Sequence, residues 1–230
     1  MQRTKQVLLP VTGFMMLATL FLVSFWVPSD QNLGVSHRIF YLHVPIAVLS
    51  LVPPFLVFFA SIGYLLRNSE RWDTFAYSVV EVAVLFTTLT LLTGGIWGQA
   101  TWGRPWTWDP MLTTFFILWL VYIGYLMIRS YTPPGSAGPR YSAILGIVGS
   151  ANALIVYYAT ALWRTTHPEK VLGPLAEQGS LPSEMAIGLL VSTITFVLLF
   201  TYVLIERLAL RQDESELERL SAWMQGLAQR

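Results

Sequence analysis

The residues of this chain best suited to chemistry are aromatic and closely spaced, because four tryptophans fall within twelve residues. They are Trp97, Trp102, Trp106 and Trp108, and Asp109 follows the last of them. Glycines and a proline between them allow close backbone approach and a turn. Such a segment offers several flat apolar faces, which suit a large planar ligand through stacking and burial. Any single indole here would equally fit the aromatic belt of a membrane interface.

Asp109 has a structural interpretation of its own, since Pro110 follows it. Aspartate is a preferred N-cap residue and proline a preferred first residue of a helix. The pair therefore predicts that a helix starts at residue 110. Capping explains Asp109 without a ligand and is compatible with a ligand on the neighbouring tryptophans.

The chain has three histidines, His37, His43 and His167, and no cysteine. No pair of them has the short spacing of a zinc site on one helix, and thiolate ligands are absent. His43 and His167 lie far from each other in the sequence, on either side of the tryptophan segment, and two such imidazoles suit the opposed axial positions of a heme iron. The alternative for each is an ordinary histidine at the membrane edge, which is our interpretation of His37.

Three arginines lie near these motifs and are candidate contacts for heme propionates: Arg38, Arg104 and Arg164. A guanidinium binds a carboxylate with two parallel hydrogen bonds. The alternative is that each is a solvent-exposed surface arginine.

The elements that position these residues are hydrophobic helices. Of 230 residues, 54% are hydrophobic and only 12% are charged, far fewer charges than in a soluble domain. Apart from Glu81, six apolar stretches carry no charged side chain, and each is long enough to span a bilayer as a helix. They cover residues 7–27, 44–66, 76–97, 111–128, 142–162 and 185–205. We therefore predict an all-α integral membrane protein with six transmembrane helices.

The distribution of basic residues orients these spans. With the N-terminus inside, the inner segments hold ten basic residues and the outer loops four, so the positive-inside rule places both termini in the cytoplasm. The inner ones are Arg3, Lys5, Arg67, Arg71, Arg129, Arg140, Arg207, Arg211, Arg219 and Arg230. The tryptophan-rich loop between the third and fourth helices then faces outward, as do all three histidines. A net charge of +1 gives no reason to expect nucleic acid as a partner.

Two regions follow from this layout. Residues 1–206 form the six-span membrane domain, and residues 207–230 form a cytoplasmic tail. The tail alternates leucines, Trp223 and Met224 with charged residues at helical spacing. This pattern predicts an amphipathic helix that lies on the inner membrane surface or against a partner.

The tryptophan segment resembles a signature called WWD, found in heme-handling proteins of cytochrome c biogenesis, through residues 102–109, which read WGRPWTWD. Residues 41–45, YLHVP, are similar to the segment bearing the first heme-ligand histidine of the heme exporter protein C family, CcmC. His167, with Trp163 before it, matches the position of that family's second ligand histidine. The length and the six-span layout extend the resemblance over essentially the whole chain.

The resemblance implies that heme, as noncovalent and transiently bound heme b, is held by His43 and His167 against the tryptophans. It implies that this heme is presented at the periplasmic face of the bacterial inner membrane and transferred to a membrane-anchored heme chaperone for c-type cytochrome biogenesis. The further implied partners are the ABC transporter ATPase and permease subunits and a small single-span subunit. We expect a delivery component and not an enzyme, because the outer carboxylates show no pairing suited to acid–base catalysis.

Two other functions remain as alternatives. A permease for a small solute would carry polar groups near mid-membrane, where Asn152, Glu81 and the threonines at 87, 88, 90 and 93 are candidates. Threonine is ordinary in packed membrane helices, and Glu81 lies near enough to the inner end of its span to reach the interface. A b-type electron-transfer cytochrome would place its histidines within the bilayer, whereas here they lie at the outer edge.

Overall fold

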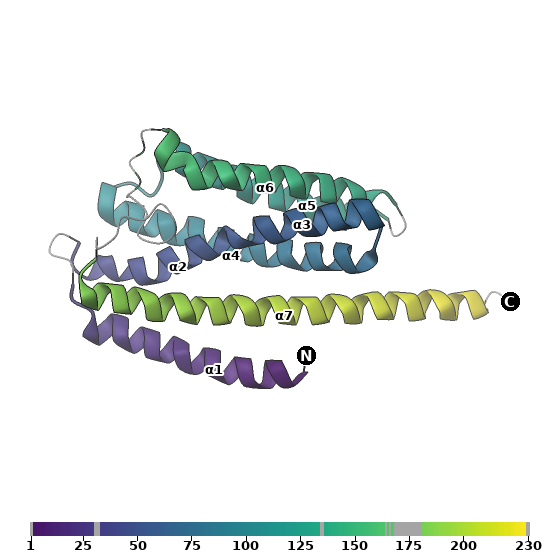
Figure 1. Cartoon of the computed structure of the whole chain (residues 1–230), viewed down its shortest axis with the longest axis horizontal. Coiled ribbons are helices and arrows are strands. Elements are labelled where there is room, and N and C mark those ends of the chain that lie inside the picture. The colour runs from purple at the N-terminus through teal and green to yellow at the C-terminus, as the bar shows by residue number, and fades with distance from the viewer. Residues whose placement is uncertain are drawn as a thin grey trace.

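The protein is a bundle of long helices (Figure 1), and the described residues include six helices that are long and apolar enough to cross a membrane. The computed structural model describes residues 2–29, 33–133, 136–163, 165, 167 and 181–228. The helices follow the order of the six apolar stretches, so the prediction of an all-α, six-span membrane protein is confirmed.

The first span is α1 (Gln2–Phe21), continued by a π-helical turn, η1 (Leu22–Trp26). A short 3-10 helix, η2 (Val35–Ile39), leads into α2 (Phe40–Ser50), α3 (Val52–Arg67), α4 (Glu70–Trp102), α5 (Pro110–Tyr131), α6 (Gly138–Leu162) and α7 (Ser183–Ala228). We call the end of the bundle with residues 33–43, 97–110 and 181–183 the loop end. The opposite end, with residues 67–70 and 131–133, is the terminal end.

The second span consists of two helices, whereas the apolar run 44–66 predicted one. Pro53 and Pro54 have no backbone N–H, so the hydrogen bonding of α2 cannot continue through them, although both are tolerated in the first turn of α3. Leu51 joins the two helices and, with Val52, lines the cavity described below. Irregular backbone at membrane depth is tolerated where it lines a cavity.

The tryptophan segment begins on a helix, because α4 extends five residues beyond the end of the apolar stretch 76–97. Trp97 and Trp102 therefore lie on α4, and only residues 103–109 form the loop. The predicted span ended at residue 97, so the helix is longer and the loop shorter than expected. Hydrophobicity ends there, but residues 98–101 contain no proline, and the helix continues through the one glycine, Gly98.

Gly103 ends α4. Its φ of 69° lies in the left-handed region, and its N–H donates to the Gln99 carbonyl at 3.2 Å. This is the usual way in which glycine closes a helix, because glycine has no Cβ to clash in that conformation.

The helices α3, α4, α5 and α6 form the centre of the bundle, with Val57, Leu118, Tyr122 and Val156 completely buried between them. The helix α1 lies outside this group, beside α7 (Figure 1). The buried hydroxyls of Thr19 on α1 and Thr195 on α7 are 2.7 Å apart. The site-bearing helix α2 packs against both α4 and α7.

The last helix, α7, runs without a break from the loop end past the terminal end, and its C-terminal part projects beyond the other helices (Figure 1). The expected tail is thus a direct continuation of the sixth span, with no helix boundary at residue 206. Leu217, Leu220 and Trp223 on this projecting part are exposed.

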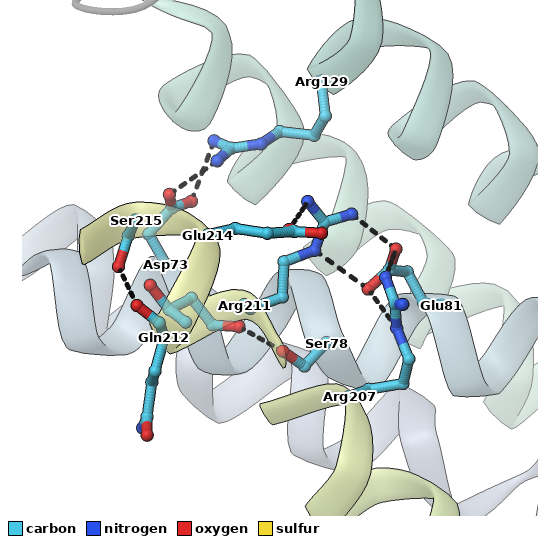
Figure 2. Close-up of polar contacts among 10 residues, drawn as sticks. Asp73, Ser78, Glu81, Arg129, Arg207, Arg211, Gln212, Glu214 and Ser215 are labelled. Atoms are coloured by element: carbon cyan, nitrogen blue, oxygen red, sulfur yellow. Dashed lines mark hydrogen bonds and ion pairs between the residues drawn. The ribbon is translucent and has the colours of Figure 1, made fainter. Parts of the chain in front are cut away.

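Glu81 of α4 is the centre of an ion cluster that attaches α7 near the terminal end (Figure 2). Its carboxylate accepts hydrogen bonds from Nε of Arg207 at 3.0 Å and from Nε of Arg211 at 3.1 Å. Arg211 also donates to Glu214 at 2.7 Å and lies over the ring of Tyr77, 3.7 Å from its centroid. The intramembrane carboxylate is therefore paired with two arginines from the segment predicted as a tail.

A second ion pair joins α4 to α5 at the same end of the bundle. Arg129 donates two hydrogen bonds to Asp73, at 3.0 and 2.8 Å, in the bidentate arrangement that guanidinium and carboxylate groups favour. Together the two clusters connect α5 and α7 to α4 where the apolar core ends (Figure 2).

Candidate functional site

A cavity of about 760 Å³ lies between α2, α3, α4, α5 and α6 near the loop end. Its volume is in the range of pockets that enclose small organic ligands, about 300–1,000 Å³. Its lining is mostly aliphatic and aromatic, and it extends from His43 in the first turns of α2 to Phe55 in α3. His43, His167, Trp97, Trp102 and Trp106 all line it. The structure thus brings together both predicted ligand histidines and three of the four predicted tryptophans.

The cavity is not fully enclosed. On one side, the lining residues Val48, Val52 and Phe55 of α2 and α3 are exposed at the surface. On the other, Leu154 and Tyr158 of α6 are exposed in the same way. A hydrophobic ligand in this cavity would therefore have an edge that the protein does not cover.

His43 is held firmly, with only 6% of its surface exposed. Its Nδ1 lies 2.9 Å from the hydroxyl oxygen of Thr93, which belongs to the neighbouring helix α4. The ring of Trp97 meets the imidazole edge-on, with 5.5 Å between the ring centroids. Gly94 lies against the imidazole, because a Cβ atom at that position would be 3.0 Å from Cε1 of His43. The imidazole is thus confined by one turn of α4.

His167 is connected to the tryptophan segment through Thr165. The backbone N–H of His167 donates to the Thr165 hydroxyl oxygen at 3.0 Å, and that hydroxyl donates to Oδ1 of Asp109 at 2.6 Å. Asp109 also accepts a hydrogen bond from the N–H of Met111 at 3.0 Å, which confirms that it caps α5. Asp109 is buried and does not line the cavity. Asp109 therefore stabilises the site from outside the cavity, because it connects the start of α5 to Thr165 and so to His167.

Two glycines on α4 allow the loop 103–109 to fold back against this helix. A Cβ atom at Gly98 would lie 3.2 Å from the Arg104 carbonyl oxygen, and one at Gly95 would lie 3.4 Å from that of Pro105. The approach is tight at Gly98, where a larger residue would push against the loop, whereas a Cβ atom at Gly95 would make an ordinary contact. Folding back brings Trp106 to the wall of the cavity.

Trp108 differs from the other three tryptophans. It is 77% exposed and does not line the cavity, and its ring meets that of Trp106 edge-to-face at 5.7 Å. It lies at the outer surface of the loop, over Trp106, in the position of an interfacial indole.

The predicted arginines do not line the cavity where the structure describes them. Arg104 is exposed on the loop and Arg38 is half-buried in η2, and neither belongs to the lining. Arg164 lies outside the described residues. His37 stacks on Phe40 with 5.2 Å between ring centroids, away from the cavity lining, consistent with its interpretation as an ordinary histidine.

Sequence reasoning weighed the α4 threonines as polar groups of a permease or as packing residues, and so missed the contact of Thr93 with His43. Thr87, Thr88, Thr90 and Thr93 each donate to the carbonyl four residues earlier, which is ordinary for threonine in a membrane helix. Thr93 alone of these contacts a predicted ligand. The signal available in the sequence was Thr93 followed by two glycines, at the start of the tryptophan segment.

In the described part of the chain, no three His, Cys, Asp or Glu residues come together as a metal-ion site. The imidazoles of His43 and His167 are the usual metal-ligating side chains in the cavity lining, which is otherwise mostly apolar. The model of the family described as CcmC, heme exporter protein C, matches residues 1–224. The chain belongs to this family.

Individual CcmC relatives show how far the likeness extends. The chain is 35% identical to the heme exporter protein C of Bradyrhizobium diazoefficiens over 174 residues, which cover 75% of this chain and 65% of the relative. It is 28% identical to that of Haemophilus influenzae over 224 residues, 96% of this chain and 90% of the relative. It is 31% identical to the Escherichia coli K12 protein over 141 residues, which cover 61% of this chain and 57% of the relative. Several alignments thus span less than two thirds of the relative, while the Haemophilus one is nearly complete.

Proposed function

We propose that this CcmC family member binds heme in the cavity at the loop end, with His43 and His167 as axial ligands, and transfers it to a heme chaperone for c-type cytochrome biogenesis. The observation that carries the proposal is that one apolar cavity is lined by both histidines and by Trp97, Trp102 and Trp106. Heme is the cargo in this proposal, and the protein supplies a place to hold and present it.

The residues of the cavity fit heme in three respects. Heme iron takes two neutral imidazole nitrogens at opposed positions, and the cavity offers two imidazoles from different parts of the fold. The macrocycle is flat and largely apolar, and indole rings provide large apolar surfaces for it. The chain has no cysteine, so heme bound here would be held noncovalently, as heme b.

Transfer requires that the bound heme remain reachable. A site that enclosed heme on all sides would hold it too long, whereas the exposed lining residues of α2, α3 and α6 and the position at the loop end would leave an edge of the heme free. We place the loop end on the periplasmic side of the bacterial inner membrane, with both termini in the cytoplasm. The partners we propose are a membrane-anchored heme chaperone, the ABC transporter ATPase and permease subunits, and a small single-span subunit.

Heme content and the Soret band of the purified protein test this proposal. We expect His43→Ala and His167→Ala each to reduce the bound heme or to shift the band, because each removes one axial ligand. His37→Ala is the matched control, since this third histidine also lies at the loop end but does not line the cavity. An unchanged heme content and spectrum in both His43→Ala and His167→Ala would refute the ligand assignment.

The orientation is tested separately by reporters fused into the two ends of the bundle. A reporter that works only in the periplasm should be active when it is fused into the loop 103–109. A reporter that works only in the cytoplasm should be active when it is fused between α5 and α6. The reverse pattern would contradict the proposed direction of presentation without affecting the heme-binding assignment.

A further inference from the structure

The contact between His43 and Thr93 has a direction that the hydrogen bonds of Thr93 determine. The Thr93 hydroxyl has one proton, and its oxygen lies 2.7 Å from the Leu89 carbonyl oxygen, which can only accept. The proton is therefore used in that bond. At the 2.9 Å contact with His43, the Thr93 oxygen must then accept, so that Nδ1 of His43 carries the hydrogen.

A neutral imidazole has one N–H, so a hydrogen on Nδ1 leaves the lone pair on Nε2. Nε2 is the nitrogen that remains free to bind a metal. In metal sites, the second ring nitrogen of a ligand histidine is almost always hydrogen-bonded, which fixes the ring and increases the basicity of the ligand. Thr93 stands in that relation to His43.

The neighbouring residues of α4 restrict the ring further. Gly94 leaves space for Cε1 of His43, where a Cβ atom would approach to 3.0 Å, and Trp97 contacts the imidazole edge. Gly94 and Trp97 lie within one turn of α4, whereas His43 belongs to α2. Rotation of the ring would bring it against the helix or break the hydrogen bond to Thr93.

We propose that Thr93 is a positioning residue, assisted by Gly94. Before heme binds, Thr93 holds His43 as the Nδ1–H tautomer, so that the lone pair of Nε2 is available to bind iron. The inference rests on the proposed function, since it assigns Thr93 a purpose through His43. It goes beyond that function by naming the residue that selects the nitrogen which binds iron.

The tautomer is measured directly in the heme-free protein. Because the chain has three histidines, nitrogen-15 NMR of histidine-labelled protein at about pH 8.5, where histidine is ordinarily neutral, gives few signals. The His43 signals are those lost in His43→Gln. We expect the wild type to show a protonated Nδ1 and an unprotonated Nε2. A protonated Nε2 in the wild type would overturn the proposal.

Three variants separate positioning from general packing. Thr93→Val keeps the shape but removes the acceptor, and we expect it to shift His43 toward the Nε2–H tautomer. Thr93→Ser keeps the hydroxyl and should restore the wild-type tautomer. Thr87→Val is the matched control, because Thr87 is also buried on α4 and bonded to a carbonyl, whereas His43 contacts Thr93.

Heme binding gives the second measurement. We expect Thr93→Val to lower heme affinity by about 10- to 100-fold, the usual effect of removing a partner of a metal-bound histidine. The midpoint potential of any heme that still binds should rise, since the imidazole is then a weaker base. Thr93→Ser should retain affinity and potential close to the wild type. Gly94→Ala should also weaken binding, by displacing the ring.

The outcomes distinguish this inference from the proposed function. If His43→Gln leaves heme binding intact while the NMR shows the Nδ1–H tautomer, the ligand assignment fails and the tautomer assignment stands. If His43→Gln abolishes binding but Thr93→Val leaves affinity and potential unchanged, the positioning role of Thr93 is refuted. A loss of affinity in Thr87→Val equal to that in Thr93→Val would also refute it.

Discussion

Neutralising Glu81 tests how strongly the ion cluster attaches α7 to the bundle. Glu81→Gln keeps the size of the side chain and one acceptor but removes the charge shared by Arg207 and Arg211. Removing one partner of a buried pair costs about 3–5 kcal/mol, because the remaining charges are left uncompensated. The side chains of Glu81, Arg207 and Arg211 are 17%, 29% and 22% exposed, so water partly compensates the charges that lose their partner. We therefore expect Glu81→Gln to lower the free energy of unfolding by about 2–3 kcal/mol.

The measurement is thermal unfolding in detergent, followed by circular dichroism. At about 2–4 °C per kcal/mol for a chain of this size, Glu81→Gln should lower the Tm by roughly 4–12 °C. Arg219→Gln is the control, because its ion pair with Glu70 has side chains 68% and 55% exposed. Such an exposed pair contributes about 0–1 kcal/mol, so its loss should be small.

A combined variant sharpens the test. Arg207→Gln with Arg211→Gln leaves Glu81 as an unpaired carboxylate and should also be strongly destabilised. Adding Glu81→Gln to that pair removes the unpaired charge at residue 81, so the triple variant should be less destabilised than the sum of its parts. The reasoning fails if Glu81→Gln lowers the Tm no more than Arg219→Gln, or if the effects are simply additive.

Three further predictions concern the loop end. Asp109→Ala should lower stability by about 1 kcal/mol through loss of the α5 cap, measured by thermal unfolding, and should alter the Soret band because the bond to Thr165 is lost as well. Gly103→Ala should destabilise by about 1–2 kcal/mol, since a φ of 69° is unfavourable for alanine, and unchanged stability would contradict the left-handed cap. Trp106→Ala should reduce heme affinity more than Trp108→Ala, measured by heme titration, because only Trp106 lines the cavity; the opposite order would contradict the assignment of the cavity wall.

The spans and the N-cap of α5 could be predicted from the sequence because they depend on local patterns. Apolar runs of sufficient length predict membrane helices, and Asp109-Pro110 predicts a helix start whatever surrounds it. The end of α4 was misplaced because hydrophobicity was used to find it. Backbone hydrogen bonding determines a helix end, and that continues until the left-handed Gly103.

Long-range contacts account for the rest. The partners of Glu81 lie 126 and 130 residues away in the sequence, so composition placed Arg207 and Arg211 in a tail although they are paired within the bundle. The convergence of His43 and His167 on one cavity was expected from topology, but the extent of the cavity depends on how the five surrounding helices pack. Thr93 looked like any other membrane threonine until the structure showed which side chain faced it.

The unbroken course of α7 sets how far the protein reaches on one side of the membrane. A helix rises about 1.5 Å per residue, so the 21 steps from Arg207 to Ala228 extend roughly 32 Å past the ion cluster. The helix α4 follows α3 there after only two intervening residues, Asn68 and Ser69. A molecule that approaches the turn between α3 and α4 therefore passes alongside the projecting part of α7 (Figure 1), whose length past the ion cluster is close to the thickness of the hydrocarbon core.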